Sequence, residues 1–264
     1  MADGPEKTVI VTGATYGIGR AITLRLAGAG FRVIGCGLED SQPGSRARAG
    51  IGPTRAALSA AGLSAELVEA DVTREEDVER VIVAARQGGG AIWALVNNAA
   101  VRPAGTITEI TPEAWRRALD VNLTGAFLMA RAVLDDLRAH HGRIVNIGSG
   151  AAWGKPGIAA YGASKAGLYG LTMAMAYDHL AEGVAVNMVI PGPGTASGML
   201  EAMESAGGGN QVPLTVTGRA NQPEDTGEMV AYLLSPAAAQ ISGAVFDVGG
   251  FFHQGGAGQP RRPA

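Results

Sequence analysis

Residues 12–19 read Thr12-Gly13-Ala14-Thr15-Tyr16-Gly17-Ile18-Gly19. They lie between a β-branched apolar run at 8–12 and a segment with helical apolar spacing at 18–26. Glycines in Gly-x-x-x-Gly-x-Gly spacing let the backbone turn tightly, and a pyrophosphate fits on the free N–H groups where a helix begins. A strand-to-helix turn without a ligand also uses glycines. The position at the first strand-to-helix junction favours a dinucleotide site, formed by Gly13, Thr15, Tyr16, Gly17, Ile18 and Gly19.

Strand-like and helix-like segments alternate along the rest of the chain. The patterns predict strands over 8–12, 31–36, 66–70, 91–96, 143–147, 184–189 and 244–248. They predict helices over 18–26, 54–61, 111–139 and 161–180, one from Thr73 with a Thr73-Arg74-Glu75-Glu76 capping box, and one from Pro223. Such alternation requires parallel crossover units. We therefore expect an α/β fold: a single Rossmann-type, doubly wound parallel sheet of about seven strands with helices on both faces.

The chain of 264 residues is long enough for one large core, and no linker divides it. We expect an N-terminal tail over 1–6, one domain over 7–252, and a polar, Gly/Pro-rich, mobile tail over 253–264. Residues 41–53 read as a surface loop, and Thr111 and Pro112 as the N-cap and first residue of a long helix.

Composition excludes several classes of function. A formal net charge of -3 provides no basic face for nucleic acid. Cys36 is the only cysteine, so neither a disulfide framework nor a thiolate metal cluster is expected, and the four histidines lack ligand spacing, so no metal is implied. No signal-like start or membrane-length apolar run occurs. A cytoplasmic protein that binds no membrane is expected.

Tyr161 and Lys165 stand four residues apart, on one face of a predicted helix. A phenol has a pKa near ~10, too high for a base at neutral pH. A nearby ammonium group and an oxidised nicotinamide ring would both stabilise the phenolate and lower that pKa. Tyr161 could then exchange a proton with a substrate oxygen while a hydride moves at the adjacent carbon. A helix that carries this pair by chance is the alternative.

Two further polar residues fit the same chemistry. Ser149 ends a predicted strand, where its hydroxyl could hydrogen-bond a substrate oxygen, or only cap a turn. Asn122 falls inside the long predicted helix, although asparagine is a poor helix former unless its side chain has a role. Its amide could hold a water molecule beside Lys165 and continue the path of the proton.

In this order and spacing, the phosphate loop, Asn97-Asn98-Ala99-Ala100, Asn122, Ser149 and Tyr161-x-x-x-Lys165 resemble the short-chain dehydrogenase/reductase family over about residues 7–250. The resemblance implies the catalytic residues Asn122, Ser149, Tyr161 and Lys165. It implies that Lys165 also binds the nicotinamide ribose and that Tyr161 lies beside the cofactor. It implies further cofactor contacts from Asp71 and Val72 (adenine), Asn98, Ala99 and Ala100 (cleft), Pro191 and Gly192 (nicotinamide), and Thr195 (carboxamide). Family members are usually homotetramers, and we expect a homo-oligomer here.

The sequence departs from the family pattern at the end of the second strand. NAD-preferring relatives commonly carry an aspartate there, whereas this chain has Gly37, followed by Glu39 and Asp40. Two carboxylates without an adjacent cation would repel a 2′-phosphate, which favours NAD and places Glu39 at the ribose. NADP stays open, because Arg46 or Arg48 could fold back from the loop. Ala100 replaces the usual glycine, and Gly194 an aliphatic residue.

The leading function is an NAD(P)-dependent oxidoreductase that interconverts a small secondary alcohol and a ketone. The fold also supports reduction of C=C or C=N bonds, dehydration and epimerisation, and a non-catalytic nucleotide-binding sensor is the alternative from another class. The pocket would be lined by residues near 101–104, 150–153 and 192–203, where Arg102 and Lys155 leave an acidic substrate possible. The segment 198–210 is either a lid over the substrate or a surface loop.

Overall fold

The structure, a computed structural model, describes residues 7–39, 50–88, 90–192, 217 and 219–249. Seven strands form one sheet in the order β3-β2-β1-β4-β5-β6-β7, and every pairing is parallel. The strands are β1 (Lys7–Thr12), β2 (Arg32–Gly37), β3 (Glu66–Glu69), β4 (Ala91–Asn97), β5 (Arg143–Ile147), β6 (Ala185–Pro191) and β7 (Val245–Val248). The predicted doubly wound sheet is confirmed.

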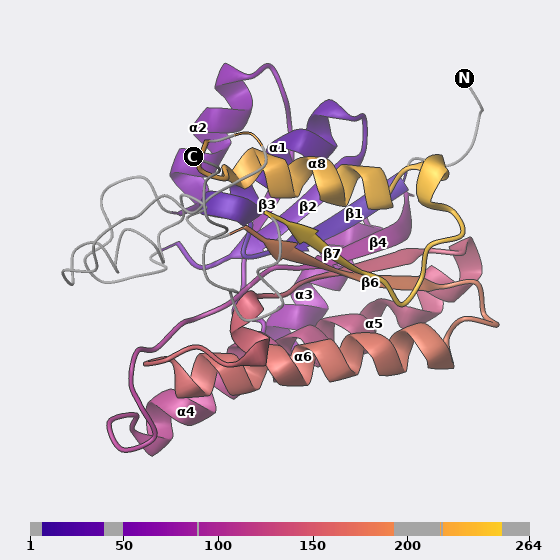
Figure 1. Ribbon diagram of the computed structural model, residues 1–264. Coiled ribbons are helices and arrows are strands. Elements are labelled where there is room, and N and C mark those ends of the chain that lie inside the picture. The colour runs from indigo at the N-terminus through magenta and orange to yellow at the C-terminus, as the bar shows by residue number, and fades with distance from the viewer. Residues whose placement is uncertain (1–6, 40–49, 89, 193–216, 218, 250–264) are drawn as a thin grey trace, which may run out of the picture.

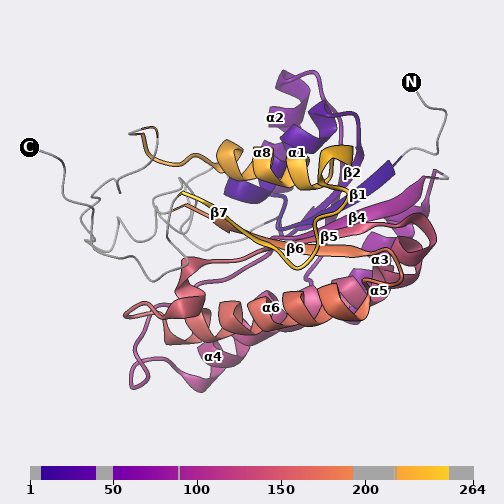
Figure 2. The same ribbon diagram turned by 45° about the vertical axis from the view of Figure 1, so that its right-hand side comes forward.

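Helices cover both faces of this sheet (Figures 1 and 2). One face carries α1 (Gly17–Gly28), α2 (Ile51–Ala60) and α8 (Pro223–Leu233). The other carries α3 (Glu75–Arg86), α4 (Pro112–Leu119), α5 (Gly125–His140) and α6 (Ala159–Asp178). Short helical turns occupy Asp120–Thr124 (η1), Gly150–Trp153 (η2) and Pro236–Ala238 (η3).

Alternate side chains of each strand enter two separate cores. Ile10 of β1 packs with residues of α3, α5 and α6, whereas its neighbours Val9 and Val11 pack with residues of α1 and α8. This arrangement follows from the two-residue period of a strand, and it explains why the central strands are apolar throughout.

The chain reverses its direction of winding between β1 and β4. From β1 it proceeds to β2 and β3 on one side, and it then returns to β4, which pairs with the other edge of β1. The loops that follow these two adjacent strands therefore leave their carboxyl ends in opposite directions. Doubly wound sheets bind ligands in the crevice between two such loops. The phosphate loop predicted over residues 12–19, a glycine loop, follows β1 at this point of the sheet, and Asn98 follows β4.

The structure corrects three predicted helix boundaries. The helix predicted over 54–61 begins at Ile51. The capping box at Thr73 is wrong: α3 begins at Glu75 after Arg74, and the Thr73 hydroxyl donates to Asp71 instead (2.7 Å). The long helix predicted over 111–139 is divided into α4 and α5 by the π-helical turn η1.

The N-cap predicted at Thr111 is confirmed, because its Oγ1 accepts a hydrogen bond from Ala114 N (3.2 Å) and Pro112 is the first residue of α4. Several other expectations lie outside the described residues: the tails over 1–6 and 253–264, Asp40, Arg46 and Arg48, Thr195, Gly194 and the segment 198–210.

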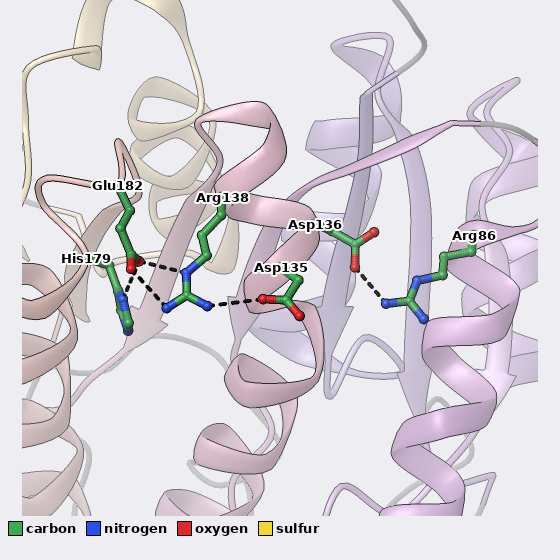
Figure 3. Close-up of polar contacts among 6 residues, drawn as sticks. All are labelled: Arg86, Asp135, Asp136, Arg138, His179 and Glu182. Carbon is green, nitrogen blue, oxygen red and sulfur yellow. Dashed lines mark hydrogen bonds and ion pairs between the residues drawn. The ribbon is translucent and has the colours of Figure 1, made fainter.

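Ion pairs connect α5 to its neighbours on both sides (Figure 3). Arg86 of α3 pairs with Asp136 (2.8 Å), and Arg138 binds both carboxylate oxygens of Glu182 (2.8 and 3.0 Å). His179, which follows α6, also contacts Glu182 (2.7 Å). Because Arg86, Arg138 and Glu182 are largely exposed, these contacts contribute little to stability. None of the described helices combines the length and apolar character that crossing a membrane requires.

Two glycines of α1 allow a matched test of the packing beneath the glycine loop. A Cβ on Gly19 would lie 2.0 Å from Gly13 O, whereas one on Gly28 would lie 3.7 Å from the nearest atom, in Leu63. Gly19→Ala should lower the free energy of unfolding by about 1–3 kcal/mol, because the backbone must move to accept the methyl group. Gly28→Ala, the control, should leave it unchanged or raise it slightly. Urea unfolding of both variants measures the difference; equal stabilities would contradict the packing described.

Candidate active site

The glycine loop is held in shape by the end of β4. Asn98 Nδ2 donates hydrogen bonds to the carbonyl oxygens of Thr12 (3.0 Å) and Gly13 (3.1 Å). In return, Thr12 Oγ1 accepts hydrogen bonds from the backbone N–H groups of Asn98 and Ala99, both at 3.0 Å. Asn98 and Ala99, predicted to line the cofactor cleft, thus lie directly against the loop that would hold the pyrophosphate. Ala100 follows them, half-buried.

The conformation and packing of the loop require glycine at Gly13, and the helix that follows begins without a cap. Gly13 and Gly17 have positive φ angles, 64° and 49°. A Cβ on Gly13 would lie 2.8 Å from Asn98 Nδ2. The N-terminus of α1 has no side-chain cap at Tyr16 and no acidic residue in its first turn. This uncapped positive end of a helix suits an anion, so the residues present fit a dinucleotide pyrophosphate.

The residues that follow β2 were predicted to approach the ribose of the cofactor. A Cβ on Gly37 would lie 2.9 Å from Thr15 Oγ1, so a side chain there would require Thr15 to move. Glu39 Oε1 faces the first turn of α2, at 3.5 Å from Gly52 N. Arg20 binds Thr15 O (2.9 Å) across the same junction. Sequence reasoning placed Glu39 at the ribose; the structure gives its carboxylate a contact at the start of a helix.

The residues predicted near the adenine follow β3. Although burial acts against its charge, hydrogen bonds from Thr73 and the ion pair with Arg117 (3.0 Å) hold the pKa of Asp71 below its usual value. Val72 is buried and, with Thr12, Ala99 and Asn122, lines one recess beside the glycine loop. Arg117 carried no signal in the sequence, because its partner lies 46 positions away.

Asn122 lies in the π-helical turn η1 and is buried. Its Oδ1 accepts a hydrogen bond from Val101 N (2.7 Å), and its Nδ2 donates to Val101 O (2.9 Å) and to Ser164 Oγ (2.8 Å). Both amide hydrogens are therefore used. The sequence suggested that this amide holds a water molecule beside Lys165, whereas in the structure it joins the loop after β4 to α6.

The structure brings Ser149, Tyr161 and Lys165 together. Tyr161 and Lys165 are both buried on α6, and Lys165 Nζ lies 5.8 Å from the centre of the Tyr161 ring. Nζ donates a hydrogen bond to Ile147 O (2.7 Å), at the end of β5. Ser149 follows the same strand, and its side chain hydrogen-bonds the phenol. Ile147 and Ser149, at the end of β5, thus lie against Tyr161 and Lys165 of α6 at the carboxyl edge of the sheet.

Burial changes the pKa values of both Tyr161 and Lys165. It raises the pKa of Tyr161 above its usual value, against the hydrogen bond from Ser149 and the positive charge of Arg102. Burial also lowers the pKa of Lys165, to about 8. The sequence predicted that the Lys165 ammonium lowers the pKa of the phenol. In the structure, desolvation outweighs the opposing effects on the phenol, and Arg102 is a further cation that lowers its pKa.

The sixth strand ends beside the same edge. Pro191 closes β6, and Gly192 is buried so tightly that a Cβ there would lie 2.0 Å from Asn221 Nδ2. Both residues lie at the carboxyl edge of the sheet, and their contact with the nicotinamide stays a prediction. Within the described residues, no group of three or more His, Cys, Asp or Glu side chains is arranged to hold a metal ion.

Comparisons with known proteins agree with this arrangement. The family model for short chain dehydrogenases matches residues 7–206. The chain is 37% identical to 2-(S)-hydroxypropyl-CoM dehydrogenase 3 of Xanthobacter autotrophicus, covering 93% of this chain and 96% of that protein. It is 36% identical to a 3-oxoacyl-[acyl-carrier-protein] reductase of Synechocystis sp., covering 92% and 96%. A solved structure of a variant of actinorhodin polyketide ketoreductase with NADPH superposes with a TM-score of 0.83 at 32% identity, covering 94% and 97%.

The buried amine should cost stability. An unfolded lysine keeps its proton up to about pH 10.5, whereas folded Lys165 loses it near pH 8, so the unfolded state binds more protons between these values and stability rises with pH there. Below pH 8 the buried charge costs about 3 kcal/mol, only partly offset by the hydrogen bond to Ile147 O.

Lys165→Met should therefore unfold at a higher temperature than the wild type at pH 7, while losing turnover. The advantage should shrink as the pH rises from 8 toward 10. Thermal unfolding without cofactor, followed across this pH range, measures both effects. A variant less stable than the wild type at pH 7, or a gap that does not change with pH, would contradict the assignment.

Proposed function

The chain belongs to the short-chain dehydrogenase/reductase family, and on that premise we propose that it interconverts a small secondary alcohol and a ketone, with Tyr161 as the acid/base. It is an NAD(P)-dependent oxidoreductase that acts on CH–OH or C=O groups. The observation that carries the proposal is that Ser149, Tyr161 and Lys165 lie together at the carboxyl edge of the sheet. The glycine loop at the same edge fits a pyrophosphate.

The residues divide the reaction between them. The bound nicotinamide supplies a hydride to the carbonyl carbon, or accepts one from the alcohol carbon. In the reductive direction Tyr161 gives its phenolic proton to the substrate oxygen, and in the oxidative direction it takes that proton back. Ser149 Oγ hydrogen-bonds the same oxygen as negative charge develops on it. Lys165 holds a positive charge close to the phenol, which favours the phenolate left after proton transfer.

Tyr161→Phe removes the acid/base but keeps the ring. Turnover should fall about 10²- to 10⁴-fold, the range for loss of a general acid or base, while cofactor binding persists. Tyr177→Phe, on the same helix at a position 84% exposed, is the control and should keep full activity. Single-turnover kinetics and cofactor titration separate the two effects. A variant with undiminished turnover would refute Tyr161 as the acid/base. A wild type that binds the cofactor without turning over any alcohol or ketone would favour the nucleotide-sensor alternative.

We further propose NADP(H) as the preferred cofactor, in place of the NAD favoured by the sequence. The case for NAD rested on Glu39 and Asp40. Glu39 contacts the start of α2, and Gly37 offers no carboxylate to the ribose. The ketoreductase of similar structure was solved with NADPH.

Initial rates with NADPH and NADH at matched concentrations test this preference. We expect a lower KM for NADPH. Glu39→Gln should not change the ratio of the two KM values, because this carboxylate lies at a helix start instead of the ribose. A preference for NADH, or a ratio that shifts toward NADPH in the variant, would restore the original interpretation.

We also propose that the protein forms a homo-oligomer, most simply the tetramer that the family resemblance implies. Large side chains are exposed along α5 and α6, including Phe127 (43%), Tyr169 (37%) and Tyr177 (84%). Grouped apolar side chains on neighbouring helices are characteristic of contact surfaces.

A further inference from the structure

Arg102 stands beside the acid/base. Its guanidinium carbon lies 6.0 Å from the centre of the Tyr161 ring. Its positive charge lowers the pKa of the phenol, against the effect of burial. The residue as a whole is half-buried. The family resemblance implies no role for it, although the sequence leaves an acidic substrate possible through Arg102 or Lys155.

The loop that carries Arg102 is fixed at both ends. On one side the Asn122 amide binds both the N–H and the carbonyl of Val101. On the other side Gly105 N donates to Gly157 O (2.8 Å), and Ala159 N donates to Gly105 O (3.1 Å), at the start of α6. Both anchors lead to the elements that hold Tyr161. The backbone of Arg102 therefore keeps its position relative to the phenol, as a binding residue requires.

Arg102 also differs from most arginines of the described chain in its partners. Arg86 pairs with Asp136, Arg117 with Asp71 and Arg138 with Glu182. No carboxylate among the described residues pairs with Arg102. A guanidinium that no carboxylate of the protein occupies can form charge-assisted hydrogen bonds with an anion that arrives with a ligand.

We propose that Arg102 binds an anionic group of the substrate, so that the enzyme acts on small ketones and secondary alcohols that carry a carboxylate, sulfonate or phosphate. This inference rests on the proposed function. Because the guanidinium carbon lies 6.0 Å from the centre of the Tyr161 ring, we expect a short spacer, about two or three carbon–carbon bonds, between the reacting carbonyl and the anion. The anion does not react: the hydride goes to the carbonyl carbon and the Tyr161 proton to its oxygen.

The test compares acids with their neutral esters. Acetoacetate and levulinate, a 3-oxo and a 4-oxo acid, are reduced alongside their ethyl esters by the wild type, Arg102→Gln and Arg102→Lys. Arg116→Gln, whose 3.8 Å contact with Glu113 lies on exposed α4, controls for the loss of one positive charge.

The wild type should prefer at least one acid to its ester. In Arg102→Gln, kcat/KM for that acid should fall roughly 10- to 100-fold, mainly through KM, as expected for a lost charge-assisted hydrogen bond. Its ester should change by less than about 3-fold, and Arg102→Lys should recover part of the loss. The Kd for the cofactor, measured by titration, should not change in any variant.

Three results would overturn the inference. Equal losses for acid and ester, with a pH–rate profile moved to higher pH, would show that Arg102 acts only through the pKa of Tyr161. A weakened cofactor Kd would assign Arg102 to the cofactor. Reduction of esters with no preference for either acid would refute the anion site while leaving the proposed function intact, whereas reduction of none of the four compounds would count against both.

Discussion

The hydrogen bonds from Asn98 to the carbonyls of Thr12 and Gly13 are the interaction on which the site depends. They join the ends of two strands that are adjacent in the sheet, although Asn98 and Thr12 lie 86 positions apart in the sequence. Because the chain winds away from these strands in opposite directions, the backbone on either side cannot close the gap itself. A side-chain amide does so, and the glycine loop keeps a shape that leaves the N-terminus of α1 uncapped.

A second amide extends this frame to the catalytic helix. Asn122 binds the backbone of Val101 and the hydroxyl of Ser164, and its π-helical turn interrupts what would otherwise be one long helix. Such a turn places an extra residue in the helix and is common at functional sites. The loop after β4 and the helix that carries Tyr161 are thereby joined through a buried polar contact. Movement of either one would leave buried amide groups without partners.

The sequence predicted the fold well, because apolar strands and helical spacing leave a local signature. It also predicted which residues meet, since Ser149 and the Tyr161–Lys165 pair carry recognisable spacing. It failed where a contact depends on distant residues or on competition within a turn. Thr73 donates to Asp71 instead of capping α3. The Glu39 carboxylate contacts the start of α2, and its contact with the ribose stays a prediction. No local pattern in the sequence indicates the break at η1 or the position of Arg102 beside the phenol.

Burial has opposite effects on the two titrating groups of the site, and together they define its resting state. It raises the pKa of the Tyr161 phenol and lowers that of the Lys165 amine to about 8. At neutral pH the phenol therefore keeps its proton, and most of the amine is still charged. This is the state that a ketone reductase needs, with a proton ready for the substrate oxygen and a cation beside the phenolate that remains. The oxidative direction starts from the less favourable state, because the phenol must first lose its proton inside a desolvated pocket. The positive charge of Arg102 opposes this effect of burial by lowering the pKa of the phenol.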